Sequence, residues 1–435
     1  MRLLWGAALW LTLASPLVWG LDPRLAVTQF GHDIWTSAEG LPDDSIRGIA
    51  QTADGYLWFA TTNGLARFDG VSFTVLDSST GLGSNWVTAL AADPDGSLWI
   101  GCRVPSGLLR YRKGKFLEVS PSFGLPTQMF RALLVDSRGV LWIGGDGGLA
   151  RFHQGRVSRV FAGSMESNVH VILEHPKGTV WVGANNGLHR FEGASGRIYT
   201  TKDGLVDNSI WGLAPAPDGG LWVGTHQGGL TLLRGGRLRT YTAHDGLPPG
   251  GITSLLSDVD GALWIGTDGG GLGRFAGGKF SSYQTRDGLS NQVIRCLFED
   301  AEGSVWLGTA GGGINRLKEY RVTTLTTRQG LPSDSIRSLQ ADRWGDLWLG
   351  TSAGVARVRS SGQISVYGAR DGLASDLTWP VFRDNSNNFW AGSESGVLQQ
   401  FRDEPGGSPQ RVWKLRGPVS LLFEQRDGSM WASSG

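Results

Sequence analysis

One tryptophan recurs along most of this chain in a Leu-Trp-Ile-Gly-like setting, at intervals of 39 to 43 residues. A fixed period of this length means that one supersecondary unit is repeated and that neighbouring units bury each other's apolar faces. We expect these tryptophans to lie in the core. The ten copies are centred on Trp58, Trp99, Trp142, Trp181, Trp222, Trp264, Trp306, Trp348, Trp390 and Trp431.

Each unit has the pattern of four short strands joined by tight turns. Asp-Gly and Gly-Gly pairs separate the apolar runs, and such pairs favour hairpins because glycine adopts a positive φ at no steric cost. The unit is therefore predicted to be a four-stranded antiparallel meander. In the sixth unit the strands are predicted at residues 252–256, 263–267, 272–275 and 280–283.

The second strand of the unit indicates how the units stack. In the first unit Leu57 and Phe59 point to one face of the sheet, whereas Trp58 and Ala60 point to the other, so both faces are apolar. The residue two positions after the tryptophan is usually glycine, which leaves room for a neighbouring sheet. A radial array buries both faces of every sheet. The sequence therefore predicts an all-β fold, a β-propeller of four-stranded antiparallel blades.

The repeats also predict how the chain is divided. Residues 40–47 and 330–337 are closely matched, and they open units one and eight, as expected for a duplicated seven-blade module. We expect residues 21–320 to form a first seven-bladed propeller, closed by a strand within residues 27–35. Residues 321–435 would then form the first three blades of a second propeller, the last one incomplete.

The N-terminus and the composition restrict the cellular setting. Residues 1–20 combine an early arginine, an apolar run and small residues, the pattern of a signal peptide, and an uncleaved membrane anchor is the alternative. The net charge is +1, which argues against nucleic acid as a partner. Cys102 and Cys296 have no metal-binding spacing and are expected to be free thiols. The histidines show no paired metal spacing, and we expect no cofactor or metal.

The repeat resembles a known family. Residues 246–275, 288–317 and 330–358 follow one pattern, in the order Gly-Leu, Ile, Leu, Asp, Gly, Leu-Trp-Ile-Gly-Thr, Gly-Gly-Leu and Arg-Phe. This pattern is similar to the two-component regulator propeller repeat. The start at residues 30–42 is similar to the usual start of such sensors. The resemblance implies two tandem propellers, a β-sandwich, a membrane helix and a histidine kinase or diguanylate cyclase. We expect a fragment of such a protein, periplasmic, from an inner-membrane-anchored parent that is able to form a homodimer.

The ligand of such a sensor would be a small molecule or an oligosaccharide, and one repeat position is a candidate for its site. Eleven residues before the signature tryptophan, near the entry of the first strand, the side chains are often cationic or aromatic. The candidates are Arg47, Arg131, His170, Trp211 and Arg295, with Thr88, Thr253, Arg337 and Trp379 at the same position in the other units. Arginine would bind carboxylate or sulfate, and Trp211 would stack on a sugar face. Alternatively, each arginine pairs with a nearby acid such as Asp43, Asp44 or Asp334.

Two other functions stay open at this point. Propellers also include lyases, and streptogramin lyases have similar tryptophan-rich repeats. His170, Glu174 and His226 are the one set of residues near each other in the sequence that such an enzyme could use. A non-enzymatic interaction scaffold would need one exposed apolar patch and no pocket. The sequence favours a sensor region of a two-component system without a catalytic centre of its own.

Overall fold

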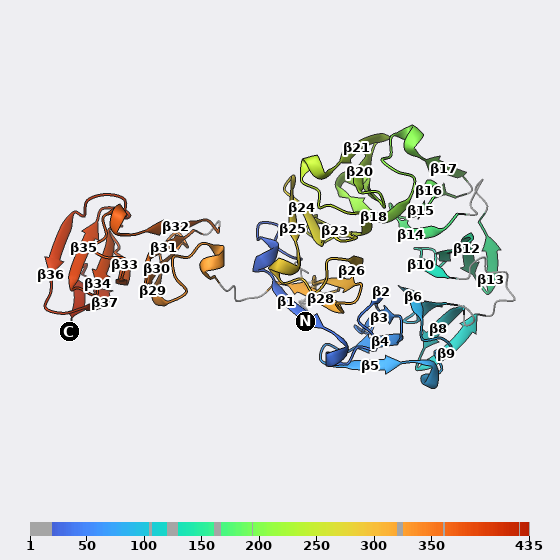
Figure 1. The fold of residues 1–435 in the computed structure, drawn as a ribbon, viewed down its shortest axis with the longest axis horizontal. Helices are drawn as coiled ribbons and strands as arrows, with labels where there is room; N and C mark the ends of the chain where they lie inside the picture. The colour runs from blue at the N-terminus through green and yellow to red at the C-terminus, as the bar shows by residue number, and fades with distance from the viewer. Residues whose placement is uncertain are drawn as a thin grey trace, which may run out of the picture. The chain divides into compact units, whose positions relative to one another are not determined.

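The computed structural model describes residues 20–103, 107–119, 129–160, 167–193, 195–319, 325–359, 362–425 and 427–434. In this part of the chain the strands form nine four-stranded sheets and one two-stranded sheet. The predicted all-β propeller fold is confirmed (Figure 1). The chain forms two compact units, Met1–Arg321 and Val322–Gly435. Most of the predicted signal peptide, residues 1–19, lies outside the described residues, and no described helix is long and apolar enough to cross a membrane.

The first unit contains seven four-stranded sheets, and six of them are built from consecutive strands. Blades one and two comprise β2 (Ile46–Gln51), β3 (Leu57–Thr61), β4 (Gly64–Phe68) and β5 (Phe73–Leu76), then β6 (Val87–Ala92), β7 (Leu98–Cys102), β8 (Leu108–Arg112) and β9 (Lys115–Val119). Blades three and four comprise β10 (Phe130–Val135), β11 (Leu141–Gly145), β12 (Gly148–His153) and β13 (Arg156–Arg159), then β14 (Val169–Glu174), β15 (Thr179–Ala184), β16 (Gly187–Glu192) and β17 (Ser195–Tyr199). Blades five and six comprise β18 (Ile210–Ala216), β19 (Gly220–Thr225), β20 (Gly229–Arg234) and β21 (Arg237–Tyr241), then β22 (Ile252–Ser257), β23 (Leu263–Thr267), β24 (Leu272–Ala276) and β25 (Lys279–Tyr283).

The seventh blade joins the two ends of the unit. Its strands β26 (Ile294–Glu299), β27 (Val305–Thr309) and β28 (Ile314–Lys318) are completed by β1 (Gly31–Trp35). β1 runs antiparallel to β28, with Gly31 opposite Lys318 and Trp35 opposite Ile314. The Trp35 ring stacks on Trp306, with ring centroids 5.3 Å apart. The first strands of neighbouring blades contact each other around the whole ring, so they are innermost (Figure 1).

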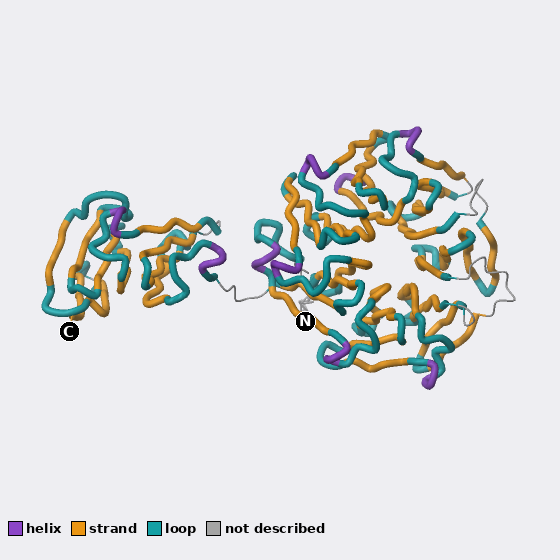
Figure 2. The backbone as a smooth tube through the Cα atoms, in the orientation of Figure 1, coloured by secondary structure: helices purple, strands orange, loops and turns teal. Residues whose placement is uncertain are grey.

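Short 3-10 helices lie on the connections, and many of them lead from one blade to the next (Figure 2). In the first connection between strands, Gly40 ends the helix with φ of 104°, a left-handed conformation that favours glycine, and the next residue, Leu41, is buried. The helices are η1 (Val27–Gln29), η2 (Ser37–Glu39), η3 (Ser78–Thr80), η5 (Thr201–Asp203), η6 (Pro217–Gly219), η7 (Ala243–Asp245), η8 (Thr285–Asp287), η9 (Thr327–Gln329) and η10 (Ala369–Asp371).

The signature tryptophans pack between blades. Trp264 is fully buried, and its indole Nε1 donates a hydrogen bond of 2.7 Å to Asp258 Oδ2 in the preceding turn. The same carboxylate accepts a hydrogen bond from the Ala262 amide, which explains the aspartate of the repeat as a turn residue. A Cβ at Gly266 would lie 2.9 Å from Ile294 of the next blade. Glycine at this position therefore allows the close approach that the sequence predicted.

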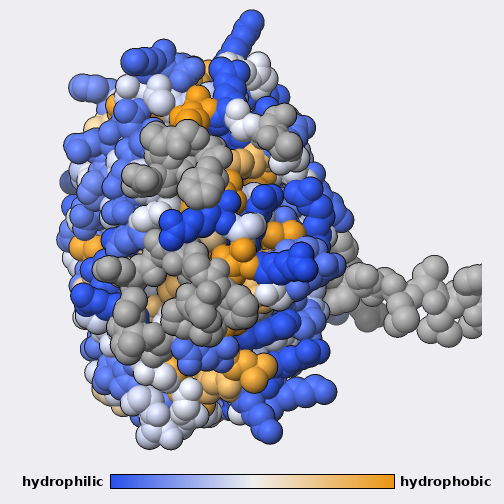
Figure 3. All heavy atoms as spheres, turned by 90° about the vertical axis from the view of Figure 1, so that its right-hand side faces the viewer, coloured by the Kyte–Doolittle hydropathy of each residue, from blue (hydrophilic) through white to orange (hydrophobic). Residues whose placement is uncertain are grey.

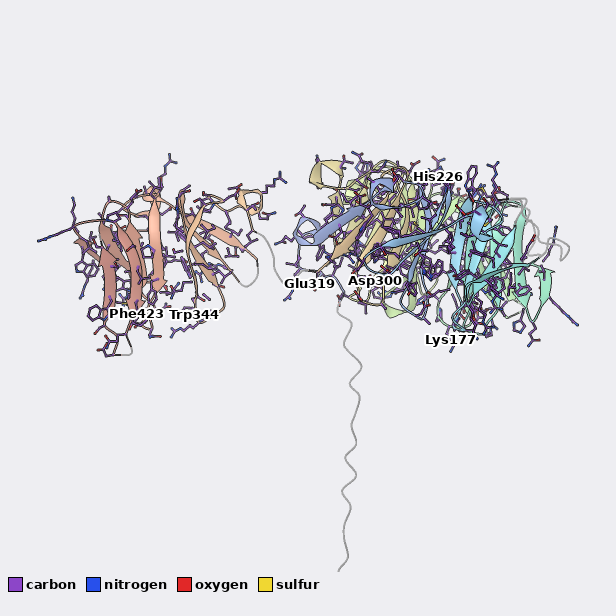
Figure 4. The ribbon with its side chains drawn as sticks, turned by 90° about the horizontal axis from the view of Figure 1, so that it is seen from below. Lys177, His226, Asp300, Glu319, Trp344 and Phe423 are labelled. Carbon is purple, nitrogen blue, oxygen red and sulfur yellow. The ribbon has the colours of Figure 1, made fainter. Side chains whose placement is uncertain are left out.

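The second unit contains two four-stranded blades and a two-stranded sheet in its described part. They comprise β29 (Ile336–Ala341), β30 (Leu347–Thr351), β31 (Gly354–Val358) and β32 (Ile364–Tyr367), then β33 (Thr378–Arg383), β34 (Phe389–Ser393), β35 (Val397–Phe401) and β36 (Arg411–Lys414), then β37 (Val419–Glu424) and β38 (Met430–Ser434). Trp344 and Phe423 lie at one edge of this unit and line a groove of about 320 Å³ (Figure 4).

The expectation that all ten tryptophans lie in the core is wrong at one position. Trp58, Trp99, Trp142, Trp181, Trp222, Trp264, Trp306, Trp348 and Trp390 are buried, whereas Trp431 is 62% exposed. Trp431 lies on β38, and no described blade packs against the face of the sheet that carries it. Both cysteines are free, as expected, and burial raises the pKa of each thiol to about 12.

Candidate ligand site on the axis of the first propeller

Every first strand of the seven-bladed unit has a β-bulge at the same repeat position. In β2 the antiparallel register shifts between Ile46 and Gly48, so Arg47 is the extra residue. A bulge bends the strand and changes the direction of the side chain that it carries. The equivalent extra residues, each flanked by the same register shift, are Thr88, Arg131, His170, Trp211, Thr253 and Arg295.

These seven residues line a single cavity of about 120 Å³ in the first unit. Met129 and Phe130, which precede the bulge in the third blade, complete the lining. The structure therefore brings together all five residues that the sequence singled out, Arg47, Arg131, His170, Trp211 and Arg295. The other two residues at the repeat position belong to the second unit, where Arg337 is exposed and the side chain of Trp379 is not described.

The cavity is positively charged. It is lined by three arginines and by no acidic residue among those that the structure describes. Arg131 Nε donates a hydrogen bond of 2.7 Å to Asp146 Oδ1. Arg47 is half-buried and makes no hydrogen bond or ion pair with any described residue, and its Nε is fully shielded from solvent. Burial, reinforced by the charges of Arg295 and Arg131, lowers the pKa of Arg47, and Asp43 partly offsets this.

The alternative in which each arginine pairs with an acid of the connecting loop is not what the structure shows for Arg47. Asp43 accepts a hydrogen bond from the Ser45 amide, and Asp44 accepts one from the Ser37 amide. Asp334 in the second unit likewise accepts a hydrogen bond from the Thr327 amide. These carboxylates therefore stabilise the loop backbone. Arg131 is paired, but with Asp146, which follows the second strand of its blade.

The aromatic part of the lining is a stack of three rings. Trp211 lies between His170 and His226, with ring centroids 4.3 and 4.5 Å away and interplanar angles of 17° and 15°. His170 Nε2 and Asn185 Oδ1 are 2.7 Å apart, and the Trp211 indole donates a hydrogen bond to Ser209 Oγ. Both faces of Trp211 are thus covered. In this arrangement neither face of Trp211 is open to a sugar, and stacking of Trp211 on a ligand stays a prediction.

The histidine of the lining adds no charge at neutral pH. Burial is the main cause that lowers the pKa of His170, although the hydrogen bond with Asn185 acts in the opposite direction. His170 is therefore mostly neutral at pH 7. The positive charge of the cavity comes from the arginines.

The hydroxyl groups of the two threonines in the lining donate hydrogen bonds to backbone carbonyls of the protein. Thr88 Oγ1 donates a hydrogen bond of 3.0 Å to the Gly101 carbonyl. Thr253 Oγ1 donates to the carbonyl of Ile294 in the next blade. Their hydroxyl protons are therefore used inside the fold. The guanidinium groups of Arg47 and Arg295 are the strong donors of the lining for which the structure records no partner among the described residues.

The three residues that a lyase could use do not come together. His170 and His226 meet on the two faces of Trp211, but Glu174 lies at the far end of β14, roughly 13 Å along the strand. The Glu174 carboxylate accepts hydrogen bonds of 2.7 Å from the amides of Ser137 and Gly178. Figure 4 shows His226 at one face of the ring and Lys177, in the turn after Glu174, at the opposite face. Among the described residues no acidic, histidine or cysteine cluster could hold a metal ion.

The sequence missed the residues that support the lining. Asp146, Asn185 and Ser209 contact the candidates from neighbouring loops, and no repeat position distinguishes them. Trp86, which directly precedes β6, is covered by the guanidinium of Arg103, which lies 4.4 Å from its ring centroid. Trp86 is not part of the cavity lining.

Comparisons with known proteins agree with this architecture. Seven segments match the family model described as two component regulator propeller, at residues 40–63, 81–103, 124–147, 204–227, 246–269, 288–311 and 330–353. The fourth blade has no match, although its four strands form the same sheet as the others. No curated protein matches the chain.

Several solved structures share the fold. The extracellular domain of the putative hybrid two component system BT3049 from B. thetaiotaomicron has a TM-score of 0.70 and 20% identity, covering 93% of this chain and 58% of that chain. Virginiamycin B lyase from Staphylococcus aureus has a TM-score of 0.56 and 15% identity, covering 67% of this chain and 100% of that chain. The WD40 propeller domain of Doa1 has a TM-score of 0.54 and 12% identity, covering 67% of this chain and 97% of that chain.

At these identities the structural likeness concerns the fold, and this chain spans less than two thirds of the BT3049 domain. The repeat matches are more specific, because they recur in register with the blades and extend into the second unit. Seven of the repeats in this chain are two-component regulator propeller repeats.

Proposed function

We propose that this chain is the extracytoplasmic, ligand-sensing region of a two-component signalling protein. Its repeats match the regulator propeller family, and the BT3049 structure that it resembles is the extracellular domain of a putative hybrid two component system. The single observation that carries ligand sensing is the cavity of the first unit, because its lining presents to a small molecule two arginines, Arg47 and Arg295, that have no recorded partner among the described residues.

In this proposal the chain acts in the periplasm after export by its N-terminal signal. Its parent is anchored in the inner membrane, able to form a homodimer, and passes the signal to a histidine kinase or diguanylate cyclase domain. The sensor role requires that ligand binding changes the protein without changing the ligand. The cavity suits this role because its strongest polar groups are always-charged arginines, which bind anions but are poor proton carriers.

The alternative functions have less support. A lyase of the streptogramin type would need acid and base groups at one place, and Glu174 is separated from the two histidines. A scaffold would need a large exposed apolar patch. On the side of the first unit seen in Figure 3, the apolar residues outside the grey atoms form small patches among hydrophilic ones. In the second unit Leu421, Phe423 and Trp431 are more than half exposed, so the scaffold alternative concerns that unit.

One experiment separates these functions. The full chain is incubated with a library of small acids, sugars and amino acids, binding is measured by thermal shift, and each ligand is recovered and identified by mass spectrometry. We expect small ligands to bind, to be recovered unchanged, and to lose affinity in Arg47→Gln. Chemical conversion of a bound ligand would overturn the sensor proposal in favour of an enzyme. A failure of every compound to bind would favour the scaffold.

A further inference from the structure

We infer that the cavity of the first unit binds a compact oxyanion, a carboxylate, sulfate or phosphate group, that bridges Arg47 of the first blade and Arg295 of the seventh. This inference rests on the proposed function in that it assigns a ligand class to the same cavity. It goes further because it names the two binding residues and excludes recognition by aromatic stacking.

The first step of the argument is the environment of Arg47. Its guanidinium Nε is fully buried and has no hydrogen-bond partner among the described residues. A buried donor without a partner costs free energy, and the cost is larger when the group is charged. Among the described residues no carboxylate accepts a hydrogen bond from it: Asp43 and Asp44 bind backbone amides, and the charge of Asp43 offsets the burial only in part. An anion that entered the cavity would supply the missing acceptor.

The second step is the position of Arg295. Arg47 and Arg295 are the bulge residues of β2 and β26, and these two strands lie side by side on the inside of the ring. Two like charges lower the pKa of Arg47, and that of Arg295 has a larger effect than that of Arg131. Two guanidinium groups from adjacent strands that both face one cavity are able to share the oxygens of a single anion.

The third step excludes a neutral ligand held by stacking or by hydroxyl groups. The faces of Trp211 are covered by two histidines, and the hydroxyls of Thr88 and Thr253 donate to backbone carbonyls. Arg131 already binds Asp146. A neutral sugar would therefore find neither face of Trp211 open, whereas an anion would meet two guanidinium groups.

The size of the cavity sets the size of the ligand. Its volume of about 120 Å³ is well below the roughly 300–1,000 Å³ that is usual for a drug-sized ligand. An anionic group with a few attached atoms fits this volume. A free inorganic anion and the acidic end of a sugar acid share this chemistry, and the experiment must separate these two sources.

The position of the two arginines also links binding to ring closure. Arg295 lies on the blade that contains β1 and β28, the strands that join the two ends of the first unit. An anion between Arg47 and Arg295 replaces repulsion between blades one and seven with attraction. We therefore expect the ligand to stabilise the ring, because a ligand that binds the folded state alone raises the stability of that state.

The test is calorimetric titration of the full chain at constant ionic strength with four probes: sodium glucuronate, glucose, sulfate and phosphate. Glucuronate carries a carboxylate that glucose lacks, and the two sugars are otherwise similar in shape. Comparing their affinities therefore separates recognition of the charge from recognition of the sugar ring. We expect glucuronate, sulfate or phosphate to bind and glucose to show no binding. Arg47→Gln and Arg295→Gln should each weaken anion binding by at least about tenfold.

Arg337→Gln is the matched control, because Arg337 occupies the same repeat position in the second unit. It should leave the affinity unchanged. A thermal melt checks folding: Arg47→Gln removes a charge without a recorded partner, so its melting temperature without ligand should not fall. A melting temperature that rises with the anion in the native chain and in Arg337→Gln, but not in Arg47→Gln, supports the inference.

Other outcomes overturn it, and they separate it from the proposed function. Equal binding of glucose and glucuronate, with both lost in Arg295→Gln, would contradict the anion class while keeping a sensing cavity. Anion binding that survives in both glutamine variants would contradict the site. Binding of glucuronate followed by its chemical conversion would contradict the sensor function while keeping the anion class.

Discussion

The two units are built from one repeat, but they differ in what lies against their sheets. In the first unit each signature tryptophan packs on the next blade: Trp222, for example, lies in one apolar cluster with Leu255. In the second unit Leu339, at the same repeat position as Leu255, is 62% exposed, and Trp431 is 62% exposed. Leu255 itself is 8% exposed. The repeat therefore specifies a blade, whereas burial of its two faces depends on a neighbour at each side.

The difference also explains where a ligand site is able to form. In the first unit seven bulges face one cavity, so that side chains from blades that are distant in sequence act together. In the second unit Arg337 lies on the same kind of bulge, between Ile336 and Ser338, and it is exposed. A single repeat position thus produces a lining in the closed unit and a surface residue in the other.

The largest expected difference between the units is the cost of removing a signature tryptophan. Trp264→Ala should lower the free energy of unfolding of the first unit by about 3–5 kcal/mol, because it leaves a large cavity between two blades. Trp431→Ala should change that of the second unit by less than about 1 kcal/mol, since the side chain is exposed. Urea unfolding of the two variants measures both values. Equal costs would contradict the contrast in burial.

Acid should destabilise the first unit specifically, because all seven histidines lie before residue 320. Burial lowers the pKa of His189 from 6.5 to about 4. Between these values the unfolded chain binds a proton that the folded chain does not, so stability is present above pH 6.5 and is lost as the pH falls towards 4. The loss from this group should be about 3 kcal/mol.

Unfolding in urea at a series of pH values from 7.5 to about 4 tests this prediction. His189→Gln should remove much of the acid loss, because glutamine does not titrate there. His153→Gln is the control, since it removes an exposed histidine of the adjacent blade. If His189→Gln keeps the full acid sensitivity, other groups cause it.

A smaller difference is expected for the residue that binds the indole. Asp300 in the first unit and Gln425 in the second accept hydrogen bonds from Trp306 and Trp431, at 2.7 and 3.0 Å. Asp300→Ala leaves a buried indole donor without a partner and should cost about 1–3 kcal/mol, whereas water replaces the lost acceptor in Gln425→Ala. Thermal melts compare the two variants, and a larger effect in Gln425→Ala would contradict this explanation.

Much of the fold could be predicted because each blade is encoded locally. The tryptophan spacing, the Asp-Gly turns and the glycine after the tryptophan indicate strands, hairpins and close packing without long-range information. The repeat position of Arg47 and Arg295 also follows from alignment of the units. The exposure of Trp431 could not be predicted from its repeat, because burial of this side chain depends on a neighbouring sheet.

The detailed structure of the candidate site could not be predicted. The bulges are deviations of backbone register, and the side chains at their positions range from threonine to tryptophan, so no residue type marks them. The stack on Trp211 combines residues of two blades, and the pairing of Arg131 with Asp146 joins two strands of one hairpin. These contacts depend on tertiary structure, which a single repeat does not contain.

Hydrogen exchange of the full chain, followed by mass spectrometry, tests most directly whether the first unit is a closed ring and the second is not. The strand β1 is the informative segment, because it pairs with β28 across nearly the whole unit. We predict that residues 31–35 are as strongly protected as β27, and that residues 430–434 of β38 exchange much faster. Rapid exchange of residues 31–35, at the rate of β38, would contradict ring closure and with it the cavity that the ring surrounds.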